Sequence, residues 1–178
     1  MKVVKFGGSS LASAGQLEKV LQIIKADPER RFVIVSAPGK RSTQDTKVTD
    51  ALIKYYRDHV AGNDVTKHQQ WIIQRYRDMA LELQLKPNIL ERISKSFQKL
   101  ASLPIENNKF LYDPFLAAGE NNNAKLIAAY FSQNGINARY VHPREAGLIV
   151  SSEPGNARLL PSSYDKIEEL NEADEVLI

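Results

Sequence analysis

The segment VVKFGGSS, residues 3–10, brings together residue types that suit the binding of a phosphoryl group. Two glycines at the end of an apolar strand let backbone N–H groups approach an anion closely, because no Cβ stands in the way. A helix that follows would turn its positive end towards the same point. Lys5, on the strand itself, would add a full positive charge. The alternative is that the glycine pair forms only a tight turn.

The lysine on this strand is open to two interpretations. A lysine on an edge strand discourages pairing with other sheets and needs no further role. The apolar neighbours Val3, Val4 and Phe6 instead favour a central strand, where a lysine requires an anionic partner. We therefore predict a central strand here and a functional charge on Lys5.

A strand, a helix and a second strand must position these residues. The first strand is followed by GQLEKVLQIIKAD, whose apolar residues recur at helical spacing, and then by the apolar run FVIVS at residues 32–36. Such a βαβ unit is expected to be parallel. Ligands of parallel sheets bind at the carboxyl ends of the strands. Because GGSS and SAPGK, residues 36–40, both follow a strand, we expect both to contribute to one site.

Three helices are predicted in an excursion at about residues 49–103. Thr49 is a plausible N-cap of the first, TDALIKYYRDHV. Thr66 and Gln69 have the spacing of a capping box for the second. The third follows Pro87, with apolar residues on one side.

The α/β alternation returns in the last third of the chain. AAGENNNAKLIAAYFSQNG predicts a helix closed by Gly135, and NARYVH predicts a strand. GLIVSSEPGNARLL predicts a hairpin, because Pro154 and Gly155 fit the central positions of a type II turn. A helix from about Ser162 to Leu170 then leads to EVLI. This pattern predicts a three-layer αβα sandwich with a mainly parallel central sheet.

The chain ends on the apolar strand EVLI, with no helix after it to cover the strand. We therefore expect the fold to be incomplete at the C-terminus and residues 1–178 to be part of a longer chain. In the isolated chain, this last strand would expose an apolar edge that favours association.

Composition argues against several classes of protein. The chain has 24 basic and 21 acidic side chains, a net charge of +3 and no dense basic block, so we expect no nucleic-acid partner. The absence of cysteine excludes disulfides and thiol catalysis. No signal peptide or membrane-length apolar run occurs, so we expect a cytoplasmic protein with no membrane partner. The phosphate-loop, dinucleotide and nucleophile-elbow motifs are missing, and the three histidines lack metal-site spacing, so no metal ligands are predicted.

Several motifs, in order along the chain, resemble the aspartate kinases of the amino-acid kinase family. They are KFGGSSLA at residues 5–12, VSAPGK at 35–40, KVTDALI at 47–53, GE at 119–120 and VSSEPGNARLLPSSY at 150–164. The resemblance covers nearly the whole chain. It implies that residues 1–178 are the N-terminal part of an amino-acid kinase catalytic domain.

The resemblance also implies an activity and roles for individual residues. The activity is transfer of the ATP γ-phosphoryl group, with Mg²⁺ bound through the ATP phosphates, to the side-chain carboxylate of L-aspartate, the first step of the aspartate-derived amino acid pathway. A carboxylate acceptor needs no general base, so positioning and electrostatic stabilisation carry the catalysis. A homo-oligomer is expected for the full-length enzyme. The implied site residues are Lys5 as the catalytic lysine, Gly7, Gly8 and Ser9 as further phosphate ligands, and Ser36, Thr49 and Glu120 as substrate ligands, with Glu120 pairing with the substrate ammonium group.

Other interpretations remain open at this stage. Glu120 lies near a predicted helix start, where an acidic residue is favourable whatever its function, and Thr49 could be a helix cap only. The run NNN, residues 121–123, departs from the family pattern and leaves the local substrate contacts open. The alternative functions are a kinase for another carboxylate or a carbamate, and a non-catalytic α/β interaction module.

Overall fold

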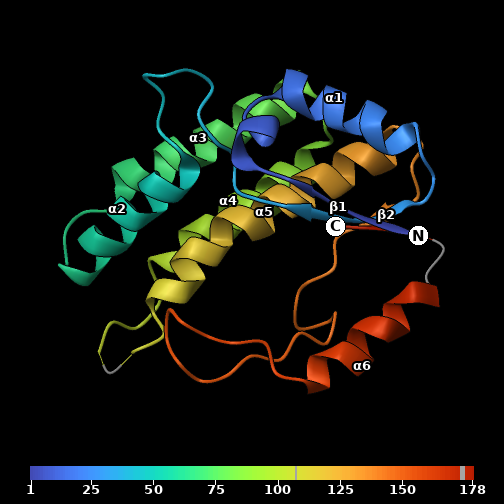
Figure 1. Cartoon of the computed structure of the whole chain (residues 1–178). Helices are drawn as coiled ribbons and strands as arrows, with labels where there is room; N and C mark the ends of the chain where they lie inside the picture. Colours follow the sequence, from blue (N-terminus) through green and yellow to red (C-terminus); the bar gives the residue numbers. More distant parts are fainter. Residues whose placement is uncertain (107, 173–174) are drawn as a thin grey trace.

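Four parallel strands form a sheet in the part of the chain that the structure describes, residues 1–106, 108–172 and 175–178. In this computed structural model the strands lie in the order β1-β2-β4-β3 (Figure 1). Figure 1 also shows helices α1 and α6 on opposite sides of the sheet. The predicted α/β class with a parallel central sheet is therefore confirmed. The strand bounds are β1 Lys2–Phe6, β2 Arg30–Val35, β3 Ala138–Arg139 and β4 Val176–Leu177.

The predicted βαβ unit is formed by β1, α1 (Ala14–Lys25) and β2. A short 3₁₀ helix, η1 (Gly8–Leu11), connects β1 to α1. The four apolar residues at helical spacing are all buried: Leu17, Val20, Leu21 and Ile24. They share one core with Phe6 and Val33, which lie on the covered face of the sheet.

Strand β1 lies at one end of the strand order, so the prediction of a central strand is wrong for the described chain. Its apolar residues divide between two faces because side chains alternate along a strand. Phe6 is buried on the covered face, whereas Val3 is 66% exposed on the other. The register places Lys5 opposite Ile34, which is 51% exposed, so both belong to this open face.

The helical excursion contains three helices, and a longer fourth helix follows it. Aromatic side chains fill the space between them: the Tyr55 hydroxyl donates to the Phe97 carbonyl at 3.2 Å, and the Tyr55 and Phe115 rings meet edge to face. No helix among the described residues has both the length and the apolar character needed to span a bilayer. The bounds are α2 Val48–Val60, α3 Thr66–Glu82, α4 Pro87–Leu100 and α5 Tyr112–Gln133.

Both predicted threonine caps are wrong. Helix α2 begins one residue before Thr49, and its N-cap Lys47 makes no side-chain capping bond. Helix α3 begins at Thr66 itself, so the spacing to Gln69 does not form a capping box. Asp64 instead accepts hydrogen bonds from the Thr66 backbone N–H at 3.0 Å and from its hydroxyl at 2.6 Å. An Asx-type turn therefore competes successfully with the predicted cap.

Helix α5 begins earlier than predicted. It starts at Tyr112 and accommodates Pro114 in its first turn, where proline needs no N–H partner. Glu120 consequently lies inside the helix and not at its start. The interpretation of Glu120 as a partner of the helix dipole is therefore wrong, because that effect is confined to the first turn. The predicted left-handed glycine after the helix is present, with Gly135 at φ +82°.

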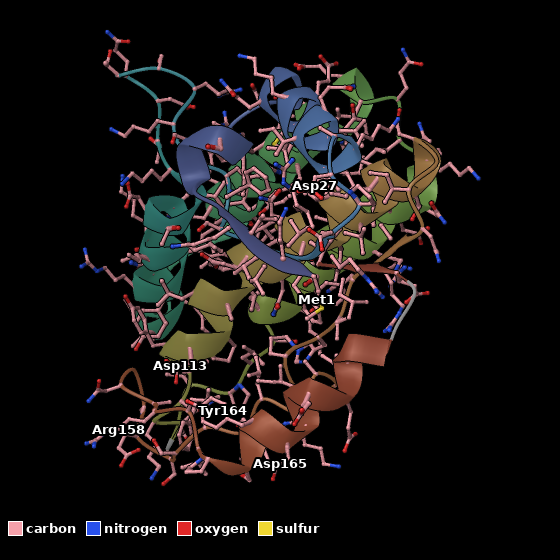
Figure 2. The ribbon with its side chains drawn as sticks, turned by 45° about the vertical axis from the view of Figure 1, so that its right-hand side comes forward. Met1, Asp27, Asp113, Arg158, Tyr164 and Asp165 are labelled. Carbon is pink, nitrogen blue, oxygen red and sulfur yellow. The ribbon has the colours of Figure 1, made fainter. Side chains whose placement is uncertain are left out.

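The predicted hairpin follows β3 in the chain. Val150 and Leu159 form an antiparallel bridge, and Gly155 adopts φ +68°, as a type II turn requires. The Gly155 N–H donates to the Asp113 carboxylate at 3.4 Å, so the hairpin tip meets the start of α5 (Figure 2). Helix α6 (Ser162–Glu168) follows and continues into η2 (Glu169–Glu172).

The last strand is not an edge, contrary to expectation. Strand β4 lies between β2 and β3 and pairs with both. Leu177 and Ile178 are buried. The apolar edge predicted for EVLI is therefore absent, because pairing between segments distant in sequence covers it.

Candidate active site

Two loops meet at the carboxyl ends of β1 and β2. We call residues 7–12 the first loop and residues 36–47 the second loop. The Gly39 N–H donates to the Gly8 carbonyl at 2.8 Å, which joins the loops directly. A Cβ on Gly39 would lie 2.6 Å from the Gly8 carbonyl carbon, so only glycine permits this approach. The structure thus brings the GGSS and SAPGK segments together.

Gly7 and Ser9 of the first loop are open to solvent, whereas Leu11 and Ala12 at its end are buried. A Cβ added to Gly7 would meet nothing within 4 Å, and Ser9 is exposed. Lys5 is also exposed, and its ammonium group has no ion pair within the part of the chain that the structure describes. These residues leave backbone donors and one cation available next to each other.

Helix α5 approaches the second loop from the other side. The Glu120 carboxylate accepts a hydrogen bond from the Ala37 N–H at 3.4 Å, and the Asn123 amide donates to the Ser36 carbonyl at 2.7 Å. Gly119 makes this approach possible, because a Cβ there would lie 2.8 Å from the Ala37 Cβ. The predicted substrate ligands Ser36 and Glu120 are therefore neighbours.

Thr49 reaches the same region through the start of α2. The Val48 N–H donates to the Pro38 carbonyl at 3.1 Å, which fixes the first turn of α2 on the second loop. Thr49 is the next residue and is half-buried. Three of the predicted ligands, Ser36, Thr49 and Glu120, thus lie on or beside one loop.

A cavity of about 250 Å³ lies between β2, β4 and α5. Ile34 and Leu177 form part of its wall, and Glu120 and Asn121 supply polar groups. Lys5 lies on the same sheet face as Ile34, because the register pairs these two residues. That Lys5 and Glu120 lie on the same side of the sheet stays a prediction.

Tyr76 is a buried residue that contacts α5 next to Glu120. Its hydroxyl donates to the Gly119 carbonyl at 2.8 Å. Burial, and to a smaller extent the charge of Glu120, raises the pKa of Tyr76 well above its ordinary value of 10.0. The phenol therefore stays protonated and continues to donate at any physiological pH.

Arg75 is a buried residue of the site that our sequence analysis missed. It is 2% exposed, and its Nη2 donates to the Ala12 and Gly39 carbonyls, each at 2.8 Å. Its Nη1 donates to Asp45 at 3.0 Å. A signal was present in the sequence, because Arg75 follows the apolar Ile72 by three residues and so shares its side of the helix.

Comparisons with known proteins identify the family of this chain. The whole chain, residues 1–178, matches the model of the amino acid kinase family. The chain belongs to this family. It is 48% identical over 178 residues to aspartokinase 3 of Bacillus subtilis (strain 168), a match that covers 100% of the chain and 39% of that protein. It is 27% identical over 169 residues to chloroplastic aspartokinase 2 of Arabidopsis thaliana, covering 93% of the chain and 30% of that protein.

Solved structures of amino acid kinases share the fold. The crystal structure of Clostridium acetobutylicum aspartate kinase superposes with a TM-score of 0.76 at 30% identity, over 99% of this chain and 38% of that one. Escherichia coli aspartokinase III, solved in complex with aspartate and ADP, gives a TM-score of 0.68 at 19% identity, over 98% of this chain and 39% of that one. The chain thus spans about two fifths of the length of these relatives.

The asparagines that depart from the amino acid kinase pattern have structural partners. Asn122 is fully buried, and its amide donates to the Ala118 carbonyl at 2.9 Å and to the Ser96 hydroxyl at 3.1 Å. Asn123 is also fully buried and bonds to Ser36. These amides hold α5 against α4 and the second loop.

Proposed function

We propose that this chain is the amino-terminal part of an aspartate kinase. The proposed reaction is transfer of the γ-phosphoryl group of ATP to the side-chain carboxylate of L-aspartate, which gives an acyl phosphate and ADP. The observation that carries this proposal is the 48% identity to aspartokinase 3 over all 178 residues. The contact of the first loop with the second loop, and of the second loop with α5, supports it.

The first loop is proposed to hold the transferring phosphoryl group. Gly7 has free space around its Cα, and Ser9 is exposed beside it, so their backbone N–H groups could approach phosphate oxygens. Lys5 is an exposed cation on the preceding strand. It would stabilise the charge that moves from ATP to the acceptor. Gly8 would contribute by holding the loop against Gly39.

The second loop and α5 are proposed to bind aspartate. Glu120 would pair with the substrate ammonium group, since its one contact with the second loop is a long bond of 3.4 Å that leaves its oxygens able to accept more. Ser36 and Thr49 would contact the rest of the amino acid. The substrate carboxylate is already ionised near neutral pH and needs no base.

Magnesium is proposed to enter with the nucleotide. The described residues contain no group of three acidic or histidine side chains placed to hold a metal ion. The ATP phosphates would supply its ligands, as the resemblance to aspartate kinases implies, and Lys5 is exposed to them. The proposal also includes a homo-oligomeric full-length enzyme, which light scattering of the purified protein would check.

A coupled assay of the full-length protein tests the proposal. We expect ADP release that depends on ATP, Mg²⁺ and L-aspartate together, with L-glutamate and carbamate much poorer acceptors. Preference for either alternative acceptor would reassign the substrate. No turnover with any of them would favour the non-catalytic interaction module.

A further inference from the structure

We propose that Arg75 is a positioning residue for phosphoryl transfer, which fixes the first and second loops against each other. The inference rests on the proposed function for its kinetic consequence. Its structural part stands on the contacts of the buried guanidinium alone. Arg75 reaches the site from α3, an element that carries none of the proposed ligands.

The three acceptors of Arg75 come from different segments. Ala12 lies at the end of the first loop, whereas Gly39 and Asp45 belong to the second loop. The direct bond between the loops, from Gly39 to Gly8, is therefore supplemented by a single rigid group that holds both. Loss of this group would leave buried carbonyl oxygens without their charged donor, which favours opening of the contact.

The guanidinium of Arg75 is buried and paired with a carboxylate. Asp45 lies 3.0 Å from its Nη1, and the Asp45 side chain is 10% exposed. Asp45 also accepts from the Arg41 backbone N–H at 2.8 Å and from its Nε at 2.9 Å, which folds the second loop back over Arg75. Arg75 therefore acts on the loops and does not offer its charge to a phosphate.

The third nitrogen of the guanidinium, Nε, differs from the two terminal nitrogens. The Nε of Arg75 is buried and has no partner among the described residues. Among the described residues, the side chain therefore contacts the loops through its terminal nitrogens. It is placed where its two terminal nitrogens reach both loops.

Lysine cannot replace this geometry. An ammonium group is a compact point charge, whereas the planar guanidinium directs its donors along fixed and separate directions. Arg75→Lys would keep the ion pair with Asp45 but lose simultaneous contact with Ala12 and Gly39. Asp45→Asn makes the complementary change, because it removes the ion pair and leaves both carbonyl contacts possible.

The test uses the full-length protein with Arg75→Lys, Asp45→Asn and the matched control Arg77→Lys, which alters an exposed arginine on the same helix. Hydrogen exchange would be measured at the Gly39 and Ser10 amides, together with kcat and KM well below the unfolding temperature. For Arg75→Lys we expect at least tenfold faster exchange at Gly39. We also expect kcat to fall about 10- to 100-fold per folded molecule, with a smaller change in KM.

The control Arg77→Lys should match the wild type in every measurement, and Asp45→Asn should give an intermediate result. If Arg75→Lys only lowers the unfolding temperature, with exchange at Gly39 and kcat unchanged, Arg75 merely stabilises the fold and the proposal is wrong. An inactive wild-type protein would overturn the proposed function, whereas the exchange data would still decide whether Arg75 holds the loops.

Discussion

At the scale of single residues, Lys5 carries the most direct prediction. Lys5→Met keeps the side-chain stem and removes the charge proposed to act on the phosphates. In the full-length enzyme we expect kcat to fall by about 10²–10³, equivalent to roughly 3–4 kcal/mol of transition-state stabilisation. The fold should persist, because Lys5 is exposed and makes no ion pair among the described residues.

Lys2 offers a matched control on the same strand. It lies at the opposite end of β1 and forms ion pairs with Asp27 and Glu29, on the surface away from both loops. Lys2→Met should therefore leave kcat unchanged. Equal decreases in kcat for Lys2→Met and Lys5→Met would contradict the prediction. They would show that kcat depends on the surface charge of β1 and not on the position of Lys5.

Tyr76 predicts a dependence of stability on alkaline pH. In the folded chain the pKa of Tyr76 is raised by burial, whereas the unfolded tyrosine ionises near pH 10.0. Its contribution to stability is therefore complete below pH 10 and is lost as the pH rises further, because ionisation then favours the unfolded chain. The folded chain should therefore be less stable at pH 11 than at pH 8.

Tyr76→Phe isolates this contribution. At pH 8 the variant loses the hydrogen bond to Gly119, so its free energy of unfolding should be about 0.5–1.5 kcal/mol below that of the wild type. At pH 11 the difference should shrink to near zero or reverse. Urea unfolding at both values measures it, and a constant difference would show that Tyr76 is not buried as described.

At the scale of elements, the contact between the two loops depends on Gly39. Gly39→Ala places a Cβ 2.6 Å from the Gly8 carbonyl carbon, and backbone must move to relieve the overlap. We expect a loss of about 1–3 kcal/mol in the free energy of unfolding, the usual cost of forced shifts in packed regions. Gly15→Ala is the control: its Cβ would meet nothing within 4 Å, and alanine is the better helix former in α1. A Gly39→Ala chain as stable as Gly15→Ala would show that the loops are not in contact.

The sequence predicted those elements whose signals are local. The apolar spacing in residues 17–24 and the glycine at 135 identified α1 and the end of α5, because periodicity and a left-handed cap act within a few residues. The start of α5 was predicted too late, near residue 117, because proline is a weak helix signal and Pro114 lies in the first turn. Gly119 is present for a long-range reason, since the Ala37 side chain leaves no room for a Cβ.

The sequence predicted only part of the site, because several of its contacts join residues that are distant in the sequence. The order of motifs predicted which loops carry the ligands, and the structure brings those loops together. Arg75 was missed because its acceptors lie 30 to 63 residues away in the sequence. The interior place of β4 was also unpredictable, because the pairing of β2 with β4 joins segments separated by almost the whole chain.

At the scale of the whole molecule, exposed apolar side chains of the sheet lie on β1 and β2 and not on the last strand. Val3 and Ile34 are exposed there, and β1 ends the strand order. Exposed apolar side chains that lie together favour contact with another chain, although the lysines of β1 oppose strand pairing. We therefore expect the isolated chain to associate as its concentration rises, and Val3→Lys to reduce that association. Light scattering across a concentration series would check this, with Val60→Lys, an exposed position on α2, as the control.

The activity of residues 1–178 alone also depends on how much of the whole molecule they contain. The chain spans 39% of the length of aspartokinase 3, and it contains the proposed aspartate ligands and part of the proposed phosphate cradle. Positioning and electrostatic stabilisation carry phosphoryl transfer, so a site that lacks several stabilising groups loses more than one that lacks a single group. We expect this chain to release ADP far more slowly than the full-length protein in the coupled assay with ATP, Mg²⁺ and L-aspartate. Turnover in the common enzyme range of about 1–10³ per second would mean that the described residues already hold the complete nucleotide site. If turnover is slow as expected, addition of the remaining part of the full-length protein should raise the rate, provided that it supplies the missing groups in trans. The same addition to a chain with Lys5→Met should leave turnover slow.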